Sequence, residues 1–198
     1  QGNHVGTDLA GTTDLGNGRS GVHLRFGADG NTVGGENSGE GNLISGNETG
    51  VWIQQAGTVS NTVQGNYIGV NREGTAAIPN TDWGIVVSDG AADNLIGGDR
   101  PGVSCTGPCN LISGNDEFGI VIEDSGSDSN SVDGNYIGLN IGGTAAIGHR
   151  YSGIVIQEGA SRNTIGGSRW ASACDGPCNV IGGNGEAGVL LYDSGTTS

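Results

Sequence analysis

Six short runs along the chain open with glycine and continue with apolar side chains that alternate in direction. They cover residues 21–24, 50–53, 84–87, 119–122, 153–156 and 188–191. Runs of this length, bounded by Gly, Asn, Asp and Ser, are typical of β-strands. The i, i+3, i+4 apolar spacing of a three-turn helix occurs nowhere in the chain. The pattern therefore predicts an all-β protein.

A second phrase, Asn-x-(Val/Leu/Ile)-x-Gly with slight variation, returns throughout the chain. Its eight anchors are Asn31, Asn42, Asn61, Asn94, Asn110, Asn130, Asn163 and Asn179. Asn61 and Asn130, 69 residues apart, head two similar stretches, and a shorter version precedes them. We therefore expect one domain over residues 1–198, with three tandem units at 1–60, 61–129 and 130–198, taken from a longer chain.

Units of 16 to 20 residues between anchors are too small to bury their own apolar side chains, so we expect them to stack as coils of a solenoid. The anchors would then form one structural ladder of hydrogen-bonded amides. One inward ladder would contain Val33, Ile44, Val63, Ile96, Ile112, Val132, Ile165 and Ile181. About nine coils, spaced about 4.8 Å apart, predict a rod of about 40 Å.

With these anchors and strand runs, the chain resembles the right-handed parallel β-helix proteins of the pectin-lyase-like superfamily, built from bacterial Asn/Gly-rich β-helix repeats. The resemblance covers essentially the whole chain and implies an all-β, right-handed parallel β-helix (solenoid). Eight anchors and six runs agree on the fold. They leave the function open, because one fold hosts many activities.

The composition excludes some classes of binding partner. The chain has 42 Gly, 33% hydrophobic residues and a formal net charge of −14, from 21 acidic and 7 basic residues. This acidity argues against nucleic-acid binding, which depends on Lys and Arg contacts to phosphates. No run approaches the roughly 18 apolar residues of a spanning helix, so we expect no membrane insertion.

Four cysteines form two matched Cys-x-x-x-Cys loops, at Cys105, Cys109, Cys174 and Cys178. Equivalent positions three coils apart would lie roughly 14 Å from each other, too far for one metal ion or a cross-loop disulfide. We therefore predict the disulfides Cys105–Cys109 and Cys174–Cys178, with four free thiols as the alternative. Disulfides favour an extracellular or cell-surface location.

The outward positions of the strands hold the candidate functional residues. A row that is largely apolar is the possible carbohydrate-binding or protein-binding face: Trp52, Val86, Val121, Val155 and Leu190. The next row offers the weak catalytic candidates Glu123 and Arg25. Corner carboxylates such as Asp89 and Asp124 are interpreted as solvated residues that permit weak calcium binding at most. The histidines His4, His23 and His149 are interpreted as scattered surface residues, and no metal site or cofactor is predicted.

We therefore expect a non-catalytic structural or adhesive β-helix segment of a larger secreted or surface protein. The Lys-free, acidic surface suits a soluble extracellular protein. One alternative is a polysaccharide-processing β-helix enzyme, either a lyase or a glycosidase. The other is a subunit of an extracellular fibre that assembles by end-to-end stacking of coils.

Overall fold

The computed structural model describes residues 1–167, 174–193 and 195–196, which form strands and turns without any helix. The strands lie in three sheets. Sheet 1 contains β1 (His4–Val5), β4 (Leu43–Ile44), β7 (Tyr67–Ile68), β10 (Leu111–Ile112), β13 (Tyr136–Ile137) and β16 (Val180–Ile181). Sheet 2 contains β2 (Ser20–Leu24), β5 (Thr49–Gln54), β8 (Trp83–Ser88), β11 (Phe118–Ile122), β14 (Ile154–Ile156) and β17 (Val189–Leu191). Sheet 3 contains β3 (Thr32–Gly34), β6 (Thr62–Gln64), β9 (Leu95–Gly97), β12 (Ser131–Asp133) and β15 (Thr164–Ile165).

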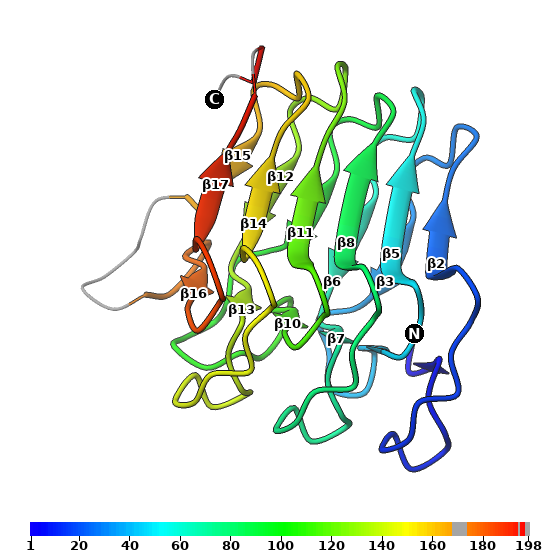
Figure 1. Ribbon diagram of the computed structural model, residues 1–198, viewed down its shortest axis with the longest axis vertical. Coiled ribbons are helices and arrows are strands. Elements are labelled where there is room, and N and C mark those ends of the chain that lie inside the picture. The colour runs from blue at the N-terminus through cyan, green and yellow to red at the C-terminus, as the bar shows by residue number, and fades with distance from the viewer. Residues whose placement is uncertain (168–173, 194, 197–198) are drawn as a thin grey trace.

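Every strand pairs in parallel with the strand three places before or after it in the chain. The chain therefore passes once through each sheet before it returns to the first, and successive coils lie side by side from β2 to β17 (Figure 1). This arrangement confirms the predicted parallel β-helix solenoid. All six glycine-led runs lie in sheet 2, at the positions that the sequence predicts for strands.

The predicted number of coils is wrong. Sheets 1 and 2 have six strands each, so the described chain makes about six coils rather than nine. The paired residues Val51, Ile85 and Ile120 set the length of a coil at 34 to 35 residues. The Asn-x-apolar-x-Gly phrase precedes both sheet 1 and sheet 3, so counting every phrase as one coil counts most coils twice. Each 69-residue repeat is therefore two coils, and six coils span about 24 Å from first to last strand.

The core lies between the three sheets and is filled by Ile and Val side chains. The single inward ladder expected from the sequence is two ladders. Sheet 3 contributes Val33, Val63, Ile96, Val132 and Ile165. Sheet 1 contributes Ile44, Ile112 and Ile181, with Ile68 and Ile137 between them and Val5 before Ile44. Sheet 2 closes the third side, so each coil shares its core with its neighbours.

Three arms project at the corner between sheets 1 and 2, below the sheet 2 strands in Figure 1. Each arm closes on itself through an antiparallel bridge, for example Val70 with Ala77. The backbone N–H of Ile141 donates to the carbonyl of Gly74, which links one arm to the next. Ile78 is buried at the end of the second arm, whereas Leu15, at the corresponding end of the first arm, is 67% exposed.

Candidate functional site

Asparagine side chains stack at all three corners of the coil, in three ladders rather than one. The ladder before sheet 1 contains Asn3, Asn42, Asn66, Asn110, Asn135 and Asn179. The ladder before sheet 3 contains Asn31, Asn61, Asn94, Asn130 and Asn163. The third, before sheet 2, contains Asn17, Asn47, Asn80, Asn115, His149 and Asn184. The eight anchors found in the sequence thus divide between the first two ladders.

The same hydrogen bonds recur at almost every step of a ladder, and Asn61 shows the pattern. Asn61 donates from its backbone N–H and from Nδ2 to Oδ1 of Asn94, both at 3.0 Å. Its own Oδ1 accepts the two corresponding bonds from Asn31. Amides and carbonyls that the corner leaves without strand partners are satisfied in this way. The ladders are therefore part of the frame of the rod.

The third ladder was missed because its residues precede a different phrase. An Asn-x-x-x-Gly pattern precedes most strands of sheet 2, as at Asn80 and Gly84, and would have identified it. His149 takes the asparagine position in one coil and is 3% exposed, so its interpretation as a surface residue is wrong. Its Nδ1 accepts from the backbone N–H of Asn115 at 3.2 Å, and its Nε2 lies 3.1 Å from the carbonyl oxygen of Ile112. Burial lowers the pKa of His149 to about 4, so the ring is neutral at pH 7.

The apolar row on the outer face of sheet 2 is mostly covered. Val86, Val121 and Val155 are at most 2% exposed and form a cluster of their own. Trp52, Trp83, Phe118 and Leu190 pack against this cluster and remain half-buried. The accessible part of the predicted binding face is therefore made by these flanking side chains and not by the valines.

Trp52 contacts residues of both neighbouring coils. Its ring stacks on His23 of the preceding coil, with centroids 4.8 Å apart and planes 6° from parallel. Its Nε1 donates to the hydroxyl of Ser88 in the following coil at 2.9 Å. The guanidinium of Arg19 lies 5.8 Å from the ring centroid. Trp52 therefore ties three successive coils together.

The two catalytic candidates do not face each other. Arg25 follows Leu24 and Glu123 follows Ile122, and those two residues occupy the same row of sheet 2 three strands apart, or about 14 Å. Glu123 is half-buried and accepts a hydrogen bond from Nε2 of Gln157 at 2.8 Å. Burial, and then the nearby carboxylates, raise the pKa of Glu123 against the opposing effect of that bond. Arg25 is exposed and lies over the ring of Phe26.

The corner carboxylates serve the turns. Asp89 and Asp124 both have positive φ, and the backbone N–H of Asp89 donates to Oδ2 of Asp124 at 3.0 Å. A second acidic group lies at the other end of sheet 2, where burial, then Glu117 and Glu48, raise the pKa of Asp82. Among the residues that the structure describes, no three His, Cys, Asp or Glu side chains are grouped so that they could hold a metal ion.

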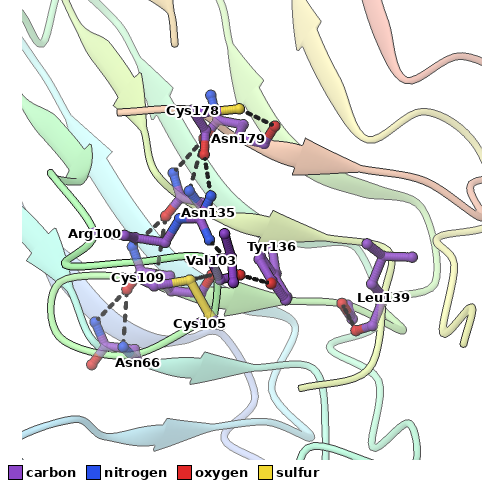
Figure 2. The surroundings of a disulfide bond; sticks show 12 residues. Asn66, Arg100, Val103, Cys105, Cys109, Asn135, Tyr136, Leu139, Cys178 and Asn179 are labelled. Atoms are coloured by element: carbon purple, nitrogen blue, oxygen red, sulfur yellow. Dashed lines mark hydrogen bonds between the residues drawn. A yellow bond between two sulfur atoms is a disulfide. The ribbon is translucent and has the colours of Figure 1, made fainter. Parts of the chain in front are cut away.

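Both disulfides are confirmed. The Cα atoms of Cys105 and Cys109 lie 5.2 Å apart, and those of Cys174 and Cys178 lie 5.3 Å apart. Sequence patterns did not indicate that the two disulfide loops also meet at Arg100, which is fully buried (Figure 2). Nη2 of Arg100 donates to the carbonyl oxygens of Cys174 and Cys178, both at 2.8 Å.

A groove of about 690 Å³ lies over the outer face of sheet 1, near the first disulfide. Its lining includes His4, Leu43 and Tyr67 of the sheet. The 35–41 loop, the 101–109 loop and Arg72 of the second arm complete it. Its size falls in the range of small-ligand sites. Sequence patterns did not indicate it, because it depends on the different lengths of two loops.

A scan against protein-family models and searches of curated proteins and of solved structures find no match to this chain. Within the described part of the chain, no helix has the length and apolar character needed to cross a bilayer.

Proposed function

We propose that this chain is a non-catalytic structural and adhesive β-helix segment of an extracellular or cell-surface protein. One observation carries the proposal: ionisable side chains on the outer surface form hydrogen bonds or ion pairs with the adjacent coil. Glu123 is bonded to Gln157, and Asp128 forms an ion pair with Arg162 at 2.7 Å. Such bonds make a stiff rod, whereas catalysis needs the groups to converge on one reacting atom.

The extracellular setting is supported by the two disulfides, because such bonds persist in oxidising compartments. Membership in the pectin-lyase-like superfamily is part of the proposal and is supported by the parallel coils and the stacked asparagines. For the adhesive role we propose the half-buried aromatic side chains of sheet 2 as the contact surface for a carbohydrate or a protein. Trp52 and Trp83 are its largest members.

The catalytic alternative is tested by incubating the chain with acidic polysaccharides and measuring new chain ends. We expect no cleavage by the wild type, by Glu123→Gln or by Arg25→Ala, since the two residues follow strands about 14 Å apart. Binding is measured on the same polysaccharides by affinity electrophoresis, with Trp52→Ala expected to weaken any retardation. Cleavage by the wild type that either Glu123→Gln or Arg25→Ala abolishes would contradict the proposal.

A fibre subunit is the second candidate. Val189 and Leu191 continue the inward rows of Ile154 and Ile156, yet they are 38% and 52% exposed. A further coil packed on this strand, from a second copy or from the same polypeptide, would cover these side chains. Light scattering at increasing concentration tests this candidate, with growing particles expected for a fibre and a constant mass arguing against it.

A further inference from the structure

Two tyrosines in equivalent places have different surroundings. Tyr67 and Tyr136 are 69 residues apart and occupy the same position of sheet 1, two coils from each other. Tyr136 is 5% exposed, whereas Tyr67 is half-buried and lines the groove. The cause is the length of a loop in the preceding coil. The loop beside Tyr136, residues 98–109, is five residues longer than the loop beside Tyr67, residues 35–41. The longer loop covers Tyr136, and the shorter one leaves Tyr67 open.

The covered copy shows what the position accepts. The guanidinium carbon of Arg100 lies 5.1 Å from the centroid of the Tyr136 ring. Nη2 of the same guanidinium donates to the carbonyl oxygens of Cys174 and Cys178. The hydroxyl of Tyr136 donates to the carbonyl of Val103. A buried arginine is thus held by one aromatic ring and two carbonyl oxygens, a combination of cation–π and charge-assisted hydrogen bonds.

Around Tyr67, the half-buried tyrosine, the disulfide loop offers the same carbonyl acceptors, and no arginine among the described residues fills the place of Arg100. Cys105 and Cys109 match Cys174 and Cys178 at the 69-residue spacing and line the groove. The two loops also sit alike on the rod, since Gly65 and Gly134 donate to Pro108 and Pro177 in the same way. Asn37 is the third residue after Gly34, as Arg100 is the third after Gly97 in the longer loop. The side chain of Asn37 bonds to Glu40 instead.

From this juxtaposition we propose that the groove binds an arginine side chain on a loop of a partner polypeptide. The guanidinium lies over the Tyr67 ring and donates to the carbonyl oxygens of Cys105 and Cys109. The Tyr67 hydroxyl donates to a backbone carbonyl of the same loop, as Tyr136 does to Val103. Arg72 and Glu36 give the lining one charge of each sign, and the net charge of −14 attracts a basic partner.

The test uses the whole chain and a capped peptide of residues 98–104, Gly-Asp-Arg-Pro-Gly-Val-Ser. A matched peptide carries citrulline, an uncharged isostere, in place of the arginine. Calorimetric titration is expected to show saturable binding of the first peptide and at least about tenfold weaker binding of the second. Equal binding of the two peptides, or no binding of either, would overturn the proposal.

Variants of the protein locate the site. Tyr67→Leu is expected to weaken binding of the arginine peptide at least about tenfold, while Tyr192→Leu, at an exposed tyrosine outside the groove, leaves it unchanged. Circular dichroism checks that both variants fold. A second variant, in which residues 98–109 replace residues 35–41, fills the groove from within and is expected to abolish binding. Unchanged affinity in Tyr67→Leu or in the loop replacement overturns the proposal, as does Tyr67-dependent binding of trigalacturonate in place of the peptide.

Discussion

An asparagine at a corner of this coil satisfies several backbone groups at once. Nδ2 of Asn61 reaches the carbonyl of Ala28 as well as Asn94, while its Oδ1 accepts two bonds from Asn31. A hydrophobic side chain cannot replace these bonds, and a longer amide would not fit the same spacing between coils. The anchors could be recognised from sequence because they recur at fixed distances. His149 could not, since only the structure shows that its ring nitrogens stand in for an amide.

The ladder predicts that substitutions at different positions along it lower the free energy of unfolding by unequal amounts. Asn61→Ala removes the acceptor of two bonds from Asn31 and the donor of bonds to Ala28 and Asn94, so we expect the free energy of unfolding to fall by about 2–3 kcal/mol. Asn31→Ala, at the exposed end of the same ladder, is expected to cost less than about 1 kcal/mol. Urea unfolding measures both. Equal losses in the two variants would mean that burial in the ladder does not decide the effect.

His149 predicts a pH dependence of defined sign. Its pKa in the folded chain is about 4, below the ordinary 6.5, so the unfolded chain binds the proton first as the pH falls. The contribution of His149 to stability is therefore complete above pH 6.5 and is lost between pH 6.5 and 4, by up to about 1.4 kcal/mol per pH unit.

Asparagine occupies the other positions of this ladder, so His149→Asn should fold and lack this loss. Raised carboxyl pKa values, as at Asp133, act with the opposite sign, and the difference between wild type and variant cancels them. Urea unfolding at several pH values between 4.5 and 7.5 gives that difference. Parallel pH profiles for the two proteins would rule out the assigned role of His149.

Loops and strands differ in how far sequence alone predicts them. The strands of sheet 2 follow from their alternating apolar side chains, because one face must reach the core. The disulfide pairing was predicted from the distance between the two loops. The loops lie two coils apart rather than three, about 10 Å, which is still beyond the reach of a disulfide. The groove and the contacts of Arg100 do not follow, since they depend on how one loop lies against a loop two coils away. The distance between the catalytic candidates Arg25 and Glu123 does not follow either, because it depends on the number of coils between their strands.

The first disulfide loop predicts a measurable effect of reduction. Cys105→Ser with Cys109→Ser frees a short loop whose cysteines are buried against Leu111 and Tyr136, so we expect the unfolding free energy to fall by about 2 kcal/mol. Dithiothreitol should destabilise the wild type further, because it also opens the second disulfide. If neither treatment changes the urea midpoint, the disulfides do not contribute to stability.

Across the described residues, the molecule is a rod of about six coils, in which neighbouring coils share a core and are joined by hydrogen bonds between polar side chains. The fold class was predictable because 69-residue repeats of strands and corners admit few architectures. The coil number was not, since two corners carry the same phrase and the third carries another. Hydrogen-bonded ladders run along all three corners of the rod, as the proposed structural role requires.

Native-state hydrogen exchange tests the central claim, that asparagine ladders join the coils into one unit. The backbone amides of Asn47, Asn61 and Asn66 each donate to an asparagine of the next coil, one amide for each corner. We predict that they exchange as slowly as the strand amides of sheet 2, at rates set by global unfolding. Fast exchange at these corner amides beside slow exchange in the strands would contradict the account.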